Sequence, residues 1–195
     1  MRRRTFDALA TAAGLVIAAV LLVAGILLGW GHSFVTSEVH TQLAAQQIYF
    51  PPAGSPAIRA PQFAAMHQYA GQLMTTGAQA EVYADHFIAN HLKVIGGGKT
   101  YAQLSTESLA QPKNAALAAQ VQTVFRGETL RGLLLNAYAF GKIATIMGIA
   151  AIGAFIGAAL MLMLSVLGLV HERRTGPAAE IFPKLGTPQP EASTR

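Results

Sequence analysis

Three side chains that could bind a metal ion lie close together in the sequence: Asp85, His86 and His91. Helical metal sites place their ligands at positions i and i+3 or i+4, as in the HExxH motif. His86 and His91 are five residues apart, so about 140° separates them on a regular helix. They cannot chelate one ion from the same helix, and a two-histidine, one-carboxylate iron site would need further helices. We therefore keep these three residues as weak metal candidates, beside the interpretation that they are ordinary surface or interfacial residues.

A second pattern with possible chemistry is the glycine run at 96–98, followed by Lys99 and Thr100. Its end resembles a phosphate-binding loop, but the GxxxxGK[ST] spacing is missing and no strand precedes it. Three consecutive glycines are costly in a helix. The run therefore predicts a turn that ends a helix and not a nucleotide site.

The densest group of charges comprises Arg126, Glu128 and Arg131. Glu128 and Arg131 are three residues apart, which favours a weak surface ion pair on one helix. The alternative is an interface with a partner protein or with anionic headgroups. Since Arg131 lies about 18 Å of helix before the next apolar stretch, a protein contact is favoured over lipid.

The amino-acid composition narrows the class of protein to which the chain can belong. The chain has 195 residues, of which 52% are apolar and 12% are charged, whereas globular domains carry roughly 25% charged residues. The absence of cysteine excludes disulfide bonds, cysteine-ligated zinc and iron–sulfur clusters. No basic stripe with interleaved aromatics is present, so nucleic acid is not an expected partner.

Two uncharged stretches predict transmembrane helices, at 8–30 and 143–170. The first spans about 35 Å as a helix, enough for a hydrocarbon core of roughly 30 Å. A cleaved signal peptide is the alternative for this stretch, but a signal peptide has an apolar run of roughly 7–15 residues. Here the run is longer, and Gly29-Trp30-Gly31-His32 follows it. Neither stretch contains an ionisable residue, which argues against an ion path or a transporter core.

Arginines predict the orientation of these two spans. Arg2, Arg3 and Arg4 precede the first span, and Arg173 and Arg174 follow the second. By the positive-inside rule, segments 1–7 and 171–195 are cytoplasmic and segment 31–142 is extracytoplasmic. The composition of segment 171–195 is typical of a disordered tail.

Small residues four apart occur in both predicted spans: Gly25 with Gly29, and Gly153 with Gly157. Such spacing lets helix backbones approach closely. We expect these two faces to pack against each other or against a partner.

The central segment reads as helical throughout. Helical periodicity and breakers predict helices at 32–50, 62–74, 77–95 and 101–111, and from about 114 into the second span. The predicted fold is an all-α membrane protein whose two transmembrane helices extend outward into a helical extracytoplasmic bundle.

Three stretches of the central segment resemble a family of uncharacterised two-pass membrane proteins from actinobacteria. They cover 83–88, 95–101 and 126–140, and the resemblance extends over nearly the whole chain apart from the proline-rich tail. Members of that family are sometimes labelled aromatic ring-opening dioxygenases. The resemblance implies membership, but it assigns no catalytic residue to this chain.

From these patterns we expect a non-enzymatic plasma-membrane protein of the cell envelope, without a cofactor. Its helical outer domain would contact protein or lipid as an accessory subunit of a larger assembly. Its partners would be the lipid bilayer and a membrane protein or a second copy of the chain. The alternatives are an extracytoplasmic ligand-binding sensor that acts through a partner, and a metal-dependent, dioxygenase-like enzyme.

Overall fold

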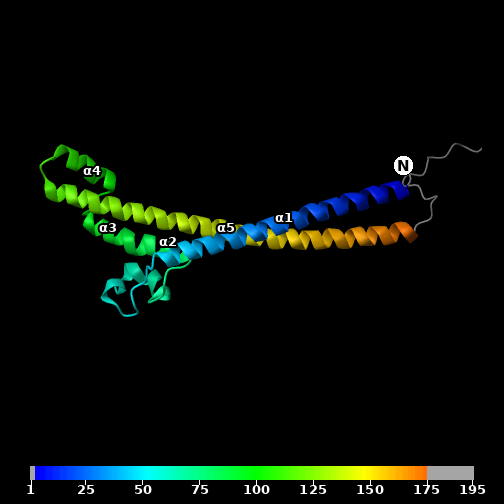
Figure 1. Ribbon diagram of the computed structural model, residues 1–195, viewed down its shortest axis with the longest axis horizontal. Helices are drawn as coiled ribbons and strands as arrows, with labels where there is room; N and C mark the ends of the chain where they lie inside the picture. The colour runs from blue at the N-terminus through cyan, green and yellow to red at the C-terminus, as the bar shows by residue number, and fades with distance from the viewer. Residues whose placement is uncertain (1–2, 175–195) are drawn as a thin grey trace, which may run out of the picture. The chain divides into compact units, whose positions relative to one another are not determined.

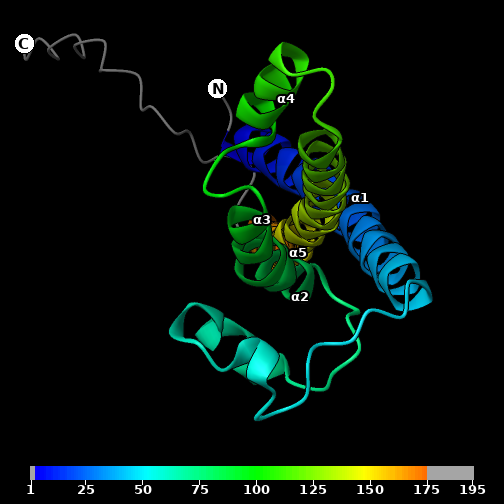
Figure 2. The ribbon, with the colours of Figure 1, turned by 90° about the vertical axis from the view of Figure 1, so that its left-hand side faces the viewer.

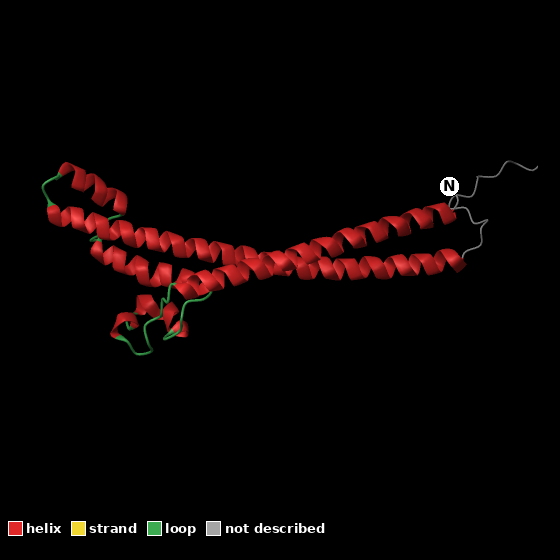
Figure 3. Cartoon of the chain, viewed as in Figure 1, coloured by secondary structure: helices red, strands yellow, loops and turns green. Residues whose placement is uncertain are grey.

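The computed structural model describes residues 3–174, and most of them are helical (Figure 1). Within this range there is no strand, only one isolated bridge (Figure 3). The predicted all-α fold is therefore confirmed for the described residues, whereas the predicted disordered tail beyond residue 174 lies outside them. The chain divides into two compact units, one formed by Met1–Leu27 with Ala150–Arg195 and the other by Leu28–Ile149.

Two long helices contain the apolar stretches. Helix α1 covers Arg3–Ala45 and helix α5 covers Ala115–Arg174. By length and composition, both are apolar enough to cross a membrane, with mean hydropathies of 2.7 and 2.4 over their most apolar windows. The prediction that each apolar stretch continues as a helix into the central segment is confirmed.

In the first unit, buried and half-buried residues repeat every seven positions on each helix. On α1 the spacing between successive buried or half-buried residues alternates between four and three positions, and on α5 between three and four. This spacing of 3.5 residues is typical of left-handed coiled-coil packing. Most members are small, so the two backbones can approach closely. The stripe comprises Asp7, Thr11, Gly14, Ala18, Leu21 and Gly25 on α1, and Ala151, Ala154, Ala158, Met161, Ser165 and Gly168 on α5.

In the second unit, α1 ends at Ala45, five residues before the predicted end at residue 50. Gln47 adopts a left-handed backbone with φ of 53°. The chain then runs extended, and Tyr49 forms an antiparallel bridge with Leu73. Hydrogen bonds on either side of this bridge fix Phe50, which is 1% exposed. Burial of an aromatic ring thus outweighs the helical periodicity that predicted a longer helix.

The helix predicted at 62–74 is wrong in type and in extent. A short 3₁₀ helix η1 (Pro56–Ile58) is followed by the 3₁₀ helix η2 (Pro61–Tyr69). Gly71 then turns the chain with φ of 74° so that Leu73 reaches the bridge. The pairing with the segment after α1 therefore replaces the last turn of the predicted helix.

The helix predicted at 77–95 is present as three consecutive pieces. They are α2 (Gly77–Val82), the π-helical segment η3 (Tyr83–Ile88) and α3 (Ala89–Ile95). Thr76 caps α2 through a capping box with Gln79. Gly97 and Gly98 have positive φ, so the glycine run ends α3 as predicted. Helix α4 covers Tyr101–Ala110.

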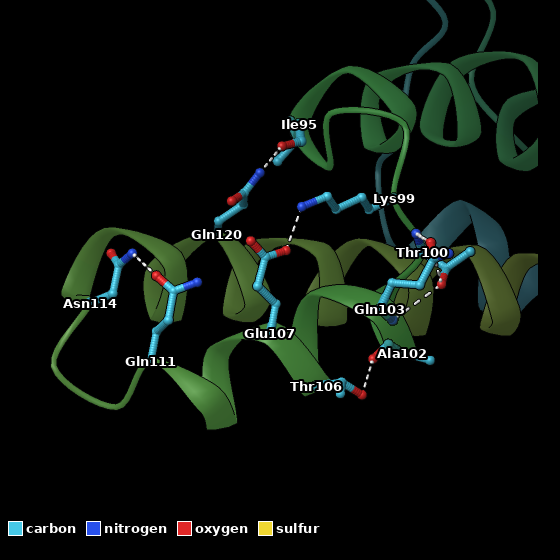
Figure 4. A network of polar contacts seen from close by, with 10 residues as sticks. All are labelled: Ile95, Lys99, Thr100, Ala102, Gln103, Thr106, Glu107, Gln111, Asn114 and Gln120. Atoms are coloured by element: carbon cyan, nitrogen blue, oxygen red, sulfur yellow. Dashed lines mark hydrogen bonds and ion pairs between the residues drawn. The ribbon is translucent and has the colours of Figure 1, made fainter.

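The second unit has its own hydrophobic core. Its buried members come from the end of α1, from the 46–74 segment and from the helices that follow. A smaller cluster of Leu104, Leu117 and Val124 joins α4 to the first turns of α5, which lie side by side in Figure 2. Polar contacts close the same end of this unit: Lys99 pairs with Glu107, and the Gln120 amide donates to the carbonyl oxygen of Ile95 (Figure 4). The main core comprises Leu43, Phe50, Ile58, Phe63, Met66, Met74, Ala80, Ala84, Ile88, Leu92 and Leu134.

Candidate functional site

Asp85, the carboxylate among the metal candidates, forms an ion pair across two helices. It lies in the π-helical segment η3, and its Oδ1 atom is 2.8 Å from Nη2 of Arg131 on α5. π-Helical turns are rare and often mark functional sites. Here the turn directs Asp85 to a guanidinium, so its carboxylate joins η3 to α5.

The two histidines of the metal candidates contact main-chain carbonyl groups. His86 Nδ1 is 3.3 Å from the carbonyl oxygen of Gln62, and His91 Nδ1 is 2.7 Å from that of Phe87. The His91 ring also packs on Phe87, with ring centroids 4.4 Å apart. Within residues 3–174, no group of three or more histidine, aspartate or glutamate side chains could hold a metal ion. These residues therefore do not fit the iron site that a ring-opening dioxygenase requires.

Arg131 is the most constrained of the three residues predicted as an interface. Its guanidinium contacts Asp85 and also Glu128, at 3.5 Å from Nη1 to Oε2. The hydrogen bond with Asp85 raises the pKa of Arg131, and the charges of both carboxylates add to this effect while burial opposes it. The pair with Glu128 predicted from sequence is present. Arg126 is exposed, so an interface role for this cluster stays a prediction.

An aromatic cluster lies beside this ion pair. The ring of Tyr83 contacts those of Phe50 and Phe87, with centroids 5.3 Å and 4.8 Å away. Burial raises the pKa of the Tyr83 hydroxyl. The cluster fixes η3 on the core of the second unit.

The four glycines predicted as packing residues divide into two pairs. A Cβ atom added to Gly25 would lie 2.9 Å from the Phe155 ring, and one added to Gly157 would lie 3.1 Å from Leu21. A Cβ atom added to Gly29 or Gly153 would meet nothing within 4 Å. Gly25 and Gly157 therefore lie at contacts between the two helices of the first unit. Gly29 and Gly153 leave their faces open, and contact of these faces with a partner stays a prediction.

An open apolar groove lies between α1 and α5 in the second unit. It has a volume of about 370 Å³. Three of its large side chains are more than half exposed: Phe34 at 55%, Leu133 at 60% and Phe140 at 56%. Sequence reasoning missed this groove, although Leu133, Ala137 and Phe140 follow helical spacing outside the apolar stretches. The lining is completed by Val35, Glu38, Val39, Gln42, Leu43 and Gln46.

Comparison with known proteins yields no match to any family model, curated protein or solved structure. The resemblance to the actinobacterial two-pass family stays a prediction on the residues that carry it. The apolar groove, the Asp85–Arg131 ion pair and the small-residue stripe are the structural features that bear on function.

Proposed function

We propose that this chain is a two-pass membrane protein that presents a helical domain outside the cytoplasm to a partner protein in the same membrane. It acts by contact and not by catalysis, as an accessory subunit of a larger assembly. The observation that carries the proposal is the groove whose exposed walls are Phe34, Leu133 and Phe140.

The membrane placement is supported by the two long apolar helices and their flanking charges. The stretches 8–30 and 143–170 contain no charged residue, and each suffices to cross a hydrocarbon core of roughly 30 Å. Arginines precede the first stretch and follow the second. The positive-inside rule assigns these two sides to the cytoplasm. Residues 31–142 then lie outside.

The position of the groove supports a protein partner over lipid. Its walls begin at Phe34 and Phe140, four residues after the first apolar stretch and three before the second. On α1 the groove continues to Leu43, about 14 Å further along the helix, and Gln46 lines it just after the helix ends. A lipid chain would cover only the inner end, whereas a partner helix that leaves the membrane along the groove would cover its whole length. Exposed apolar surface of this kind is typical of interaction sites.

Site-specific photocross-linking in intact cells tests this proposal. A photoreactive amino acid replaces Leu133 in the groove, and the matched control replaces Leu109 on α4, which is 81% exposed and does not line the groove. We expect a discrete cross-linked protein from position 133 and none from position 109. A product of twice the mass of the chain would identify the partner as a second copy. Equal yields at both positions, or no product at either, would overturn the proposal.

A ligand-binding sensor is the second candidate. The observation that favours it is a cavity of about 300 Å³ in the second unit, lined by His32, His40 and Lys142.

A further inference from the structure

The second unit contains a cavity whose lining carries positive and polar groups and no carboxylate. Three segments form it: α1, the chain from Thr75 into α2, and α5. Its volume is about 300 Å³, enough for a small polar group with water. The lining residues with charged or titratable side chains are His32, His40, Tyr138 and Lys142; the others are Thr36, Val39, Thr75, Thr76, Gly77, Ala78, Gly141 and Thr145.

Close backbone contacts hold the walls of this cavity. A Cβ atom added to Gly77 would lie 2.8 Å from the carbonyl oxygen of Ala137, so the start of α2 rests directly on the backbone of α5. On the other wall, His32 Nδ1 lies 2.7 Å from the carbonyl oxygen of Ala144. The same ring packs against Gly148, where an added Cβ would lie 3.0 Å from Nδ1. One wall of the cavity is therefore a contact between two backbones, and the other is the imidazole of His32 held by its hydrogen bond to Ala144.

The hydrogen bond of His32 determines what this side chain offers to a ligand. Since a carbonyl oxygen only accepts, Nδ1 carries the proton and donates to Ala144. Nε2 then becomes a donor only when the imidazole is protonated.

Lys142 supplies an ammonium group that has no ion-pair partner among the described residues. Within residues 3–174, no carboxylate forms an ion pair with its ammonium group, which lies 5.4 Å from the centroid of the Tyr138 ring. Among the threonines, Thr75, Thr76 and Thr145 already form hydrogen bonds with neighbouring groups. The ammonium group of Lys142 and the hydroxyl of Thr36 are hydrogen-bond donors, and the imidazoles of His32 and His40 add further donors when protonated. Together these groups suit an oxyanion.

The place of the cavity in the sequence selects the kind of oxyanion. His32 follows the first apolar stretch by two residues, and Lys142 directly precedes the second. If these stretches cross the bilayer as proposed above, this part of the cavity lies at the depth of the outer headgroups, where phosphate is the commonest anion. His40 lies eight residues, or about 12 Å of helix, further out.

We propose that the cavity formed by His32, Thr36, His40 and Lys142 binds a phosphate group, either the headgroup of an anionic phospholipid or a soluble phosphate. The inference assigns a ligand class to the cavity that favours the sensor candidate, and it rests on the proposed membrane placement only for the choice of the lipid source. The donor set itself is independent of that placement.

The experiment uses the full chain in nanodiscs that contain phosphatidylcholine alone or phosphatidylcholine with phosphatidylglycerol in a ratio of four to one. Native mass spectrometry counts the lipids that remain bound after release from the nanodisc. In parallel, calorimetry in a neutral detergent measures binding of inorganic phosphate. Both arms are run at one pH and one ionic strength, so that the charge of the ligand is the same throughout.

Lys142→Gln is the test variant, and Lys113→Gln, in the loop before α5, is the control with the same charge change. Loss of one charge-assisted hydrogen bond predicts about tenfold weaker binding for Lys142→Gln and no change for Lys113→Gln. Should Lys142→Gln fail to fold, Thr36→Val takes its place, because it removes a donor without changing charge.

Retention of phosphatidylglycerol that inorganic phosphate does not displace supports the lipid source, and binding of inorganic phosphate alone supports a soluble ligand. The absence of both, or equal binding by Lys142→Gln and Lys113→Gln, would overturn the inference. The phosphate arm requires no membrane orientation, so its result is independent of the cross-linking result from Leu133.

Discussion

Replacement of Gly77 by alanine tests the close contact between α2 and α5. The added Cβ would lie 2.8 Å from the carbonyl oxygen of Ala137 and 3.0 Å from the Cα atom of Tyr138. Both atoms belong to the main chain, so the clash cannot be relieved by a rotamer change. One helix must shift by several tenths of an ångström.

The expected cost follows from measured effects of overpacking, about 1–3 kcal/mol. In a chain of this size that corresponds to a fall in Tm of about 2–12 °C. The matched control is Gly132→Ala, on the exposed face of α5, where an added Cβ meets nothing within 4 Å. There the better helix propensity of alanine predicts a gain of about 0.5–1 kcal/mol.

Thermal unfolding of the full chain in a neutral detergent, followed by circular dichroism, measures both variants. The Gly77→Ala protein should melt below the parent and the Gly132→Ala protein at or above it. Since Gly77 also lines the cavity, the same variant should bind phosphate less tightly. A Gly77→Ala protein as stable as the parent would refute the backbone contact and with it the rigid cavity wall.

Further variants test the ion pair between η3 and α5, the buried Tyr83 and the contact of Gly157 in the first unit. A double-mutant cycle of Asp85→Ala and Arg131→Ala should give a coupling of about 0.5–1 kcal/mol in chemical unfolding, because the pair is partly exposed; purely additive effects would contradict it. Tyr83 has its pKa raised by burial, so the folded state keeps the proton that the unfolded state loses above about pH 10. Stability should therefore fall as pH rises above 10, and Tyr83→Phe should reduce this fall; identical pH profiles would count against it. Gly157→Leu should weaken packing of the two apolar helices, seen as a lower melting temperature in detergent, whereas Gly153→Leu, one turn away, should not; equal losses would contradict the contact between Gly157 and Leu21.

Much of the helical architecture was predictable because local signals agree with the tertiary structure. The capping residue Thr76 and the glycine run at 96–98 bound their helix correctly, since both act within one turn. The end of α1 and the segment after Pro61 were not predictable. Their conformation depends on the bridge between Tyr49 and Leu73, a contact between residues distant in sequence.

The candidate site was predictable only in part for the same reason. Sequence spacing placed Glu128 beside Arg131, but it could not pair Asp85 with Arg131, 46 residues away on another helix. The cavity likewise combines His32 and Lys142, which are separated by most of the chain. The packing stripe, in contrast, was present in the sequence as a seven-residue repeat of small residues that includes Ala151 and Ala158.

The orientation of the chain in the membrane is the central claim, and cysteine accessibility tests it most directly. Since the chain has no cysteine, a single substitution gives one site for a maleimide that does not cross membranes. We expect Ser55→Cys, in the loop before η1, to be labelled in intact cells, and Ser193→Cys to be labelled only after the membrane is permeabilised. Labelling of Ser193→Cys in intact cells, or protection of Ser55→Cys there, would contradict it.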